Sequence, residues 1–305
     1  MTIAAPPSVK PAGARLLAFA SDIKLSHSVF AMPFALLSAT LAARTPEASW
    51  GAWSFVLVVI CMVCARTVAM AANRLLDAEG DRLNPRTARR ALPAGQLSRG
   101  YVLAMIALFS AGFVVSAGGF GLIYGNWWPL WLSVPVLLFL CAYPLLKRFT
   151  ALCHYYLGAS LALAPICAWI AFTSGIALEP LLMAGAVVCW TGGFDVIYAT
   201  ADYEHDRAHG VHSLPSRLGI GRALVASRVT HVVSVGFLVA LGLVSTDLGT
   251  LWYAAVAVTA GLMVVQHKMV RPDDLSRVNV AFFTMNGLIS VVLGLAGIVD
   301  AVWVG

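Results

Sequence analysis

The residues GAWSFVLVVICMVCARTVAMAANRLLDAEGD, at positions 51–81, decide the fold. Between residues 52 and 72 this stretch holds a single charged side chain, Arg66. As a helix, a run of this length crosses a hydrocarbon core of about 30 Å. Its apolar residues are continuous rather than alternating, which favours a helix over a barrel strand. The run leads directly into Asn73, Asp77 and Asp81, so one span ends in a row of oxygen-bearing side chains.

Similar apolar runs recur along the whole chain of 305 residues, which is 60% hydrophobic and 11% charged with a mean hydropathy of +0.84. A typical soluble domain carries about 25% charged residues. Backbone polar groups inside a bilayer must pair within the protein, and helices achieve this. We therefore predict an all-α membrane protein. The approximate limits of nine spans are 27–44, 51–76, 99–119, 127–146, 151–173, 180–201, 222–245, 249–269 and 278–303.

The basic residues predict the orientation, because cytoplasmic loops carry an excess of Lys and Arg. Alternate connections are rich in them, whereas the opposite set holds Arg44 with Glu47, Glu179 and Asp247. The N-terminus is therefore expected in the cytoplasm, and the chain in a bacterial cytoplasmic membrane with its active site facing the cytoplasm. This topology also accounts for the net charge of +6, so neither a nucleic-acid partner nor an obligate protein partner is expected. We expect residues 1–20 to be flexible and 21–305 to form one domain.

Two carboxylate motifs end spans on the predicted cytoplasmic side. In the first motif, Asn73, Asp77 and Asp81 recur every four residues and share one helical face, with Arg66 two turns earlier. In the second motif, Asp195, Asp202 and Asp206 repeat the spacing of Arg66, Asn73 and Asp77. A basic loop follows each motif. This weak internal repeat indicates two related halves, roughly 21–150 and 151–305, that face each other across one cavity.

The chemistry that suits such motifs is binding of a metal-bound diphosphate. Mg²⁺ uses a few carboxylates and the oxygens of a substrate phosphate, and nearby Arg side chains can bind the same anion in bidentate fashion. The predicted ligands are Asn73, Asp77, Asp81, Asp202 and Asp206. A lone DxxxD would more often be a solvated helix end. Two motifs in register, together with a charged Arg66 inside a span, favour function, because intramembrane charge is costly.

Four blocks of sequence resemble the UbiA superfamily of intramembrane prenyltransferases. They are Asn73-Arg74-Leu-Leu-Asp77-Ala-Glu-Gly-Asp81, Arg86-Thr87 with Arg90-Ala-Leu92-Pro93-Ala-Gly95, Tyr143-Pro144-Leu-Leu-Lys147-Arg148-Phe-Thr150, and Asp195-Val-Ile-Tyr198 with Asp202 and Asp206. Arg74 departs from the pattern, since many members have Asp there, and its role is left open. The resemblance covers nearly the whole chain. It implies nine helices around a central cavity, cytoplasmic loops over that cavity, and Mg²⁺-dependent activity.

Within the superfamily, the chain is similar to the 4-hydroxybenzoate polyprenyltransferases. Residues 23–36 and 193–195 look closer to a UbiA-like subgroup assigned to menaquinone formation by the futalosine route. The resemblance therefore implies transfer from a polyprenyl diphosphate to 4-hydroxybenzoate or 1,4-dihydroxy-6-naphthoate, in ubiquinone or menaquinone biosynthesis. Both acceptors carry a carboxylate and a hydroxyl group. The choice between them, the prenyl chain length and the oligomeric state are left open.

The remaining site residues receive roles as hypotheses. Asp77 and Asp202 are catalytic as metal ligands. Contacts to the diphosphate are assigned to Lys24, Arg86, Lys147 and Arg148. Arg66 is assigned to the carboxylate of the acceptor, and Tyr198 to stabilisation of an allylic cation through its ring face. For Asp195 three interpretations stay open: it orients the phenol, it accepts the proton, or it pairs with Arg66.

The sequence fits other functions less well. A transporter would place polar sites near the middle of the bilayer, often on broken helices, whereas most ionisable residues here gather at span ends. A CDP-alcohol phosphotransferase would carry a DxxDGxxAR signature, which is absent. Prenyl transfer to haem or to a chlorophyll-like acceptor remains an alternative. His205, His209 and His212 cluster after the second motif, and three interpretations stay open for them: a zinc site, solvated loop residues, or a lid near the diphosphate.

Overall fold

The computed structural model describes residues 11–23 and 30–303, and within them the fold is helical. The helices are α1 (Ala12–Asp22), α2 (Met32–Ala43), α3 (Ala52–Leu83), α4 (Arg99–Tyr124), α5 (Trp128–Leu146), α6 (Cys153–Thr173), α7 (Leu178–Ala199), α8 (Tyr203–His209), α9 (Leu214–Leu218), α10 (Ile220–Val244), α11 (Thr250–Met269), α12 (Val278–Val280) and α13 (Asn286–Trp303). A 3₁₀ turn, η2 (Thr200–Asp202), links α7 to α8, and a π-helical turn, η3 (Ala281–Met285), links α12 to α13. The predicted all-α class is confirmed.

Eight helical segments of the described chain are long and apolar enough to cross a membrane. They correspond to the predicted spans from 51–76 onward. The predicted first span, 27–44, corresponds to α2, which is a shorter apolar helix, while residues 24–29 lie outside the described residues. The count of nine spans and the side of the N-terminus therefore stay predictions.

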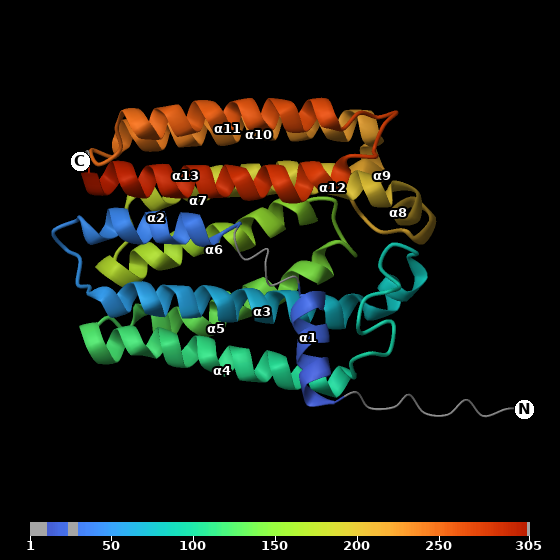
Figure 1. The fold of residues 1–305 in the computed structure, drawn as a ribbon, viewed down its shortest axis with the longest axis horizontal. Helices are drawn as coiled ribbons and strands as arrows, with labels where there is room; N and C mark the ends of the chain where they lie inside the picture. Colours follow the sequence, from blue (N-terminus) through green and yellow to red (C-terminus); the bar gives the residue numbers. More distant parts are fainter. Residues whose placement is uncertain (1–10, 24–29, 304–305) are drawn as a thin grey trace, which may run out of the picture.

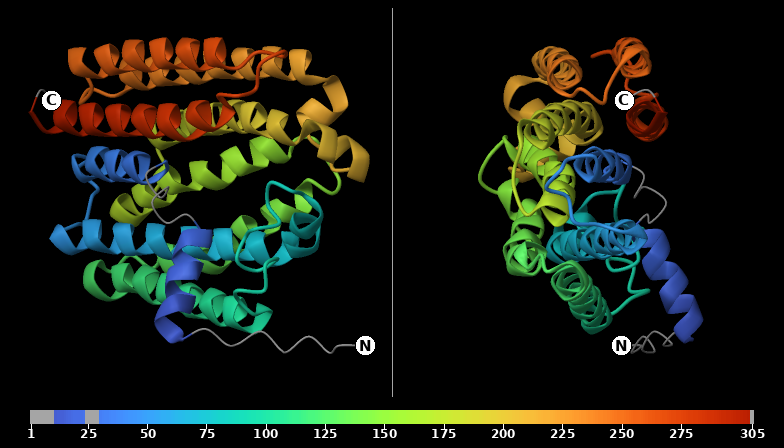
Figure 2. Two further views of the ribbon diagram at one scale, coloured as in Figure 1. Left: turned by 45° about the vertical axis from the view of Figure 1, so that its right-hand side comes forward. Right: turned by 90° about the vertical axis from the view of Figure 1, so that its left-hand side faces the viewer.

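The spans run side by side as one bundle (Figure 1). Helix α3 packs against α4 and α5, while α7 packs against both α6 and α10. Helix α2 joins these groups by packing on α6 and α13, and α11 covers α10 and α13. Figure 1 and the left view of Figure 2 place α8, α9 and the loop after α3 at the same end of the bundle. That end carries both carboxylate motifs.

Helix α7 is the most buried of the spans, and small residues let its neighbours approach closely. A Cβ atom added to Gly158 of α6 would lie 2.4 Å from the main-chain oxygen of Val188 on α7. Glycine is therefore required at this crossing, as is common where membrane helices pack backbone to backbone. The close approach fixes the wall of the bundle on which Asp195 lies.

The π-helical turn η3 interrupts the last span beside the end of α7. Such a turn frees main-chain carbonyl groups, which are costly in a membrane unless they are bonded. Gln266 Nε2 donates to Ala281 O at 2.8 Å, and Asn286 Nδ2 donates to Phe282 O at 2.8 Å. Phe282 consequently packs on Tyr198, with their ring centroids 4.1 Å apart.

Helix α1 lies crosswise to the bundle in Figures 1 and 2. It exposes Leu16 and Leu17 and buries Phe19. The boundary predicted at residue 20 falls inside this helix. Asp22, at its last turn, accepts a hydrogen bond at 3.1 Å from the main-chain N–H of Ala91. This helix therefore contacts the loop that follows α3.

Candidate active site

A single cavity of about 970 Å³ brings the predicted site residues together. Its lining includes Arg66, Asn73, Asp77, Asp81, Arg86, Lys147, Arg148, Asp195, Tyr198, Asp202 and Asp206. Lys24, which was predicted to bind the diphosphate, lies outside the described residues. Apolar side chains such as Val58, Leu132 and Ala168 complete the walls. The cavity therefore joins a charged region to an apolar one.

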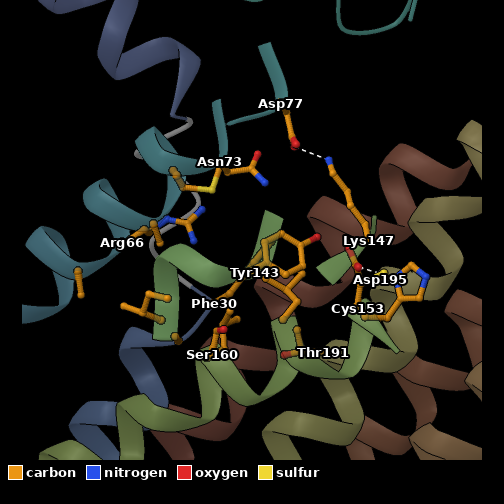
Figure 3. A pocket seen from close by; sticks show the side chains of 18 of the residues that line it. Phe30, Arg66, Asn73, Asp77, Tyr143, Lys147, Cys153, Ser160, Thr191 and Asp195 are labelled. Carbon is orange, nitrogen blue, oxygen red and sulfur yellow. Dashed lines mark hydrogen bonds and ion pairs between the residues drawn. The ribbon is translucent and has the colours of Figure 1, made fainter. Parts of the chain in front are cut away.

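The first motif lies on the last turns of α3, which is uninterrupted to Leu83. Its carboxylates are paired with cationic side chains from other segments. Lys147 Nζ donates to Asp77 Oδ2, a contact that Figure 3 marks with a dashed line. Arg90 Nη1 lies 2.7 Å from both carboxylate oxygens of Asp81. Positively charged side chains of the protein, Lys147 and Arg90, therefore neutralise the two carboxylates of this motif.

The second motif is not on one continuous helix, although its spacing repeats that of the first. Helix α7 ends at Ala199, the 3₁₀ turn ends at Asp202, and α8 begins at Tyr203. Thr200 Oγ1 donates to Ile197 O at 2.7 Å within this break. The break separates Asp195, which lies deep on α7, from Asp202 and Asp206 at the end of the bundle.

Arg86, in the loop after α3, connects that loop to the second motif. Its Nε donates to Asp202 Oδ1 at 2.8 Å, its Nη2 donates to Oδ2 of the same carboxylate, and its Nη1 donates to the Tyr198 hydroxyl at 2.7 Å. Asn84 Nδ2 adds a hydrogen bond to Asp202 Oδ1 at 3.0 Å. Burial lowers the pKa of the Arg86 guanidinium, but its hydrogen bonds and charge interaction with Asp202 outweigh burial and raise it above its ordinary value. Arg86 is therefore a permanent cation at the cavity.

The donor set fits Mg²⁺. Carboxylate and amide oxygens are the protein ligands that this ion takes, usually one or two at a time, with water and phosphate oxygens completing the shell. In the described part of the chain, no three His, Cys, Asp or Glu side chains are grouped so that they could hold a metal alone. The five predicted ligands line one cavity. They would therefore hold the ion together with a bound phosphate, rather than as a closed protein cage.

The same result bears on the histidine cluster, for which a zinc site was one prediction. The rings of His205 and His209 stack with centroids 4.1 Å apart, and His209 Nδ1 contacts the main-chain oxygen of His205 at 3.0 Å. All three histidines line the cavity. No metal-binding group of three side chains includes them among the described residues, so the structure does not support the zinc interpretation.

Arg66 projects into the cavity from α3 (Figure 3). Its Nε atom is buried and lacks a hydrogen bond to any described residue. One interpretation predicted an ion pair between Arg66 and Asp195, and this pair is not formed. The Asp195 carboxylate instead contacts His154 Nδ1 at 2.7 Å. In Figure 3, Arg66 and Asn73 come from one wall and Asp195 from another, with Tyr143 between them in this view.

Arg148 and Arg74 each donate a hydrogen bond to a main-chain oxygen that the sequence did not predict. Arg148 Nη2 donates to Leu76 O at 3.0 Å. Arg74, whose role was left open, is buried and donates from Nη1 to Asn73 Oδ1 at 3.1 Å and from Nε to Asp22 O at 3.2 Å. Arg74 therefore orients a predicted metal ligand and holds α1 against α3.

Sequence reasoning missed three residues of the cavity wall. Tyr143 belongs to a quoted sequence block but received no role, and Figure 3 shows its ring inside the cavity. Thr191 lines the cavity with a buried hydroxyl that has no hydrogen-bond partner among the described residues. His154 lies on α6 in an otherwise apolar run, 41 residues from its partner Asp195. A polar side chain inside a predicted span was the available signal for His154.

Apolar helices around one cavity with ionisable side chains at its end define the class of this protein, an integral membrane enzyme. The UbiA prenyltransferase family model matches residues 31–288. A 4-hydroxybenzoate octaprenyltransferase of Marinobacter nauticus is 30% identical over 245 residues, which cover 80% of this chain and 81% of that protein. This chain belongs to the UbiA prenyltransferase family.

Solved structures agree with this family assignment. The apo structure of a UbiA homolog from Aeropyrum pernix K1 has a TM-score of 0.79 and 32% sequence identity, covering 90% of this chain and 98% of that one. A UbiA homolog from Archaeoglobus fulgidus bound to GPP and Mg²⁺ has a TM-score of 0.70 and 18% identity, covering 93% of this chain and 99% of that one. At the latter identity the likeness shows the fold alone.

Proposed function

We propose that this enzyme transfers a polyprenyl group from polyprenyl diphosphate to an aromatic acid, with Mg²⁺ as its cofactor. The acceptor is 4-hydroxybenzoate or 1,4-dihydroxy-6-naphthoate, and the product serves ubiquinone or menaquinone biosynthesis. One observation carries the proposal: a single cavity combines acidic side chains at its end with Arg66 further along α3, whose buried Nε has no hydrogen-bond partner among the described residues. The name of the Marinobacter nauticus relative and the GPP and Mg²⁺ bound by the Archaeoglobus fulgidus homolog support it.

The diphosphate end of the cavity is assigned to the two carboxylate motifs. Asn73, Asp77, Asp81, Asp202 and Asp206 would hold Mg²⁺. When bound there, the ion neutralises the charge that develops on the departing diphosphate. Contacts to the diphosphate oxygens are assigned to Lys24, Arg86, Lys147 and Arg148. Arg86 and Lys147 are bound to Asp202 and Asp77 in the structure, so both cations stand beside the proposed metal ligands.

The acceptor end is assigned to Arg66 and Asp195. Arg66 binds the carboxylate of the aromatic acid, because a guanidinium matches a carboxylate in bidentate geometry. Asp195 takes a proton from the hydroxyl group. The bond between prenyl carbon and diphosphate oxygen breaks with its electron pair leaving on the oxygen, and the ring carbon next to the hydroxyl then bonds to the prenyl carbon. Tyr198 stabilises the allylic cation through its ring face.

The apolar walls have a role in this reaction as well. An allylic cation reacts rapidly with water, so the part of the cavity that holds it must be dry. Val58, Leu132, Leu161 and Ala168 are among the apolar residues that line the cavity. They would also contact the prenyl chain, which is a hydrocarbon.

We further propose that residues 21–305 form one catalytic domain with two related halves, 21–150 and 151–305. The cavity mouth would face the cytoplasm of a bacterium, where the water-soluble acceptor and Mg²⁺ are available. The basic loops at the carboxylate end support this orientation.

The test is product identification. The purified enzyme in lipid nanodiscs receives labelled polyprenyl diphosphate, Mg²⁺ and either aromatic acid. Transfer predicts a lipid-soluble product whose mass is the sum of acceptor and prenyl group less one hydrogen. The acid that yields it identifies the pathway. Absence of product with both acids in folded protein, or solute flux without prenyl transfer, would overturn the proposal.

A further inference from the structure

The contact between His154 and Asp195 is not explained by the roles proposed so far. His154 lies on α6 and Asp195 on α7, and His154 Nδ1 is 2.7 Å from Asp195 Oδ2. Both residues line the cavity, and their exposed fractions are 3% and 9%. On its other side, His154 Nε2 is 3.2 Å from the main-chain nitrogen of Leu214.

These two contacts determine where the imidazole carries its proton. The main-chain N–H of Leu214 can only donate, so His154 Nε2 must accept with its lone pair. A neutral imidazole with an accepting Nε2 carries its hydrogen on Nδ1. His154 Nδ1 therefore donates to Asp195 Oδ2, and the carboxylate retains its negative charge.

We infer that His154 is the positioning residue of Asp195, which is the base for the hydroxyl group of the acceptor. The inference rests on the proposed function. Oδ2 is held by the imidazole, whereas Oδ1 has no hydrogen bond from any described residue. The carboxylate thus keeps one free oxygen toward the cavity. The orienting histidine is the converse of a catalytic triad, in which a carboxylate holds a histidine.

The step that this arrangement supports conserves atoms and charge. Asp195 Oδ1 takes the hydroxyl proton, and the electron pair of that O–H bond increases the electron density of the ring. Diphosphate leaves with the electron pair of the carbon–oxygen bond, and the ring carbon then bonds to the allylic cation that remains. The ring hydrogen then leaves as a proton and aromaticity returns, while the proton on the oxygen is replaced from Asp195. One proton and one diphosphate are released in total.

The surrounding helices make His154 a rigid support. Gly158 lies one turn further along α6, where a Cβ atom would be 2.4 Å from Val188 O of α7. The two helices therefore cannot separate without losing this packing. Leu214 is the first residue of α9, whose first N–H groups have no partner within the helix. His154 satisfies the N–H of Leu214 and so binds the segment before α9.

That segment also contacts the diphosphate end. The main-chain N–H of His212 donates to Lys147 O at 2.9 Å, and Cys153 Sγ donates to His212 O at 3.5 Å. His154 is therefore positioned between the proposed base and the loop that lies beside Lys147. Substitutions that remove only the hydrogen bond to Asp195, or only the one from Leu214, distinguish the effect on the proposed base from the effect on the loop.

Two substitutions remove the hydrogen bonds of His154 one at a time. The amide nitrogen of asparagine is as many bonds from the main chain as His154 Nδ1, so His154→Asn retains a donor toward Asp195. The amide of glutamine matches Nε2 instead, so His154→Gln retains the acceptor for Leu214 and loses the donor. We expect kcat to stay within about threefold of wild type in His154→Asn and to fall about 10- to 100-fold in His154→Gln, a typical cost for an orienting partner. KM for polyprenyl diphosphate stays unchanged in His154→Gln, which retains the contact with the Leu214 N–H.

Equal losses of kcat in the two folded variants, or a larger loss in His154→Asn, would overturn the inference. A second measurement, which uses the wild type and Asp195→Asn, covers the case in which the two His154 variants do not fold. In protein labelled with ¹⁵N-histidine, the signal that moves in Asp195→Asn should be a neutral imidazole protonated on Nδ1. An Nε2-protonated ring or an imidazolium would contradict the assignment. If the wild type transfers no prenyl group to either acid, the proposed function fails, and the NMR result alone then judges the arrangement of His154.

Discussion

Arg66 is a charged side chain in the apolar part of α3, and its environment distinguishes it from the other cations of the cavity. Lys147, Arg86 and Arg90 each pair with a carboxylate. Arg66 is half-buried and its buried Nε has no hydrogen-bond partner among the described residues. An unpaired charge within a membrane is costly. We infer that an anionic group of the ligand supplies the missing partner.

Substitution of Arg66 should therefore weaken binding of the acceptor. A hydrogen bond between charged groups contributes about 1.5–3 kcal/mol, so Arg66→Met should raise KM for the aromatic acid by about 10- to 100-fold. Arg66→Lys, which keeps the charge without the bidentate geometry, should have a smaller effect. Steady-state kinetics with varied acceptor measures both values.

The control is KM for polyprenyl diphosphate in the same variants, which should stay near the wild-type value. If Arg66→Met instead raises KM for the diphosphate and leaves that for the acid unchanged, Arg66 belongs to the diphosphate end and its assignment is wrong.

Helix α1 contacts both α3 and the loop that follows α3 through one side chain, that of Asp22. The Asp22 carboxylate accepts from the main-chain N–H of Ala91 and lies 3.8 Å from Arg74 Nε, and both charged side chains are largely buried. Asp22 therefore links α3 to the loop that carries Arg86 and Arg90. Loss of a buried, charged partner is more costly than loss of an exposed one.

Asp22→Ala should release this loop. Loss of the contacts costs about 1–3 kcal/mol, and 1.4 kcal/mol corresponds to a tenfold change in an equilibrium. Trypsin should consequently cleave after Arg86, Arg89 or Arg90 about tenfold faster than in wild type, as followed by mass spectrometry. The matched control is Glu79→Ala, which removes the exposed ion pair with Arg99 and should change the rate little. Equal cleavage in both variants would show that Asp22 does not hold the loop.

The sequence predicts an element when local or bilayer constraints determine it, and fails when contacts with distant residues determine it. The bilayer fixes the length of a span, so the apolar run that begins after Gly51 predicted α3 well. The first carboxylate motif was also readable, because α3 continues without a break. The break at Thr200–Asp202 and the π-helical turn at Ala281–Met285 were not, because side-chain hydrogen bonds and packing between distant helices stabilise them. The pairing of His154 with Asp195 depends on the same long-range packing.

At the scale of the whole molecule, the orientation in the membrane is the prediction with the widest consequences. Helix α8, which carries Glu204, and the loop between α2 and α3, which carries Glu47, lie at opposite ends of the bundle (Figure 1), and both glutamates are exposed. Single substitutions Glu204→Cys and Glu47→Cys form a matched pair. In intact cells, a membrane-impermeant maleimide should label the Glu47→Cys variant and not the Glu204→Cys variant. The reverse pattern would place the active site outside the cell.

The native protein serves as the background for this measurement, since none of its six cysteines is exposed. After the cells are opened, both variants should react. This second step shows that the Glu204→Cys thiol is accessible and that its protection in intact cells was due to the membrane.

The central claim, that one cavity holds a metal-bound diphosphate beside an aromatic acid, is tested most directly by the metal dependence of prenyl transfer. The initial rate is measured with purified enzyme in nanodiscs, first in excess EDTA and then with increasing Mg²⁺, for wild type, Asp77→Ala and Asp202→Ala. We expect no transfer in EDTA, saturable recovery for wild type, and rates at least about 100-fold lower in both variants at saturating Mg²⁺. Full activity in EDTA, or wild-type rates in both folded variants, would contradict the account.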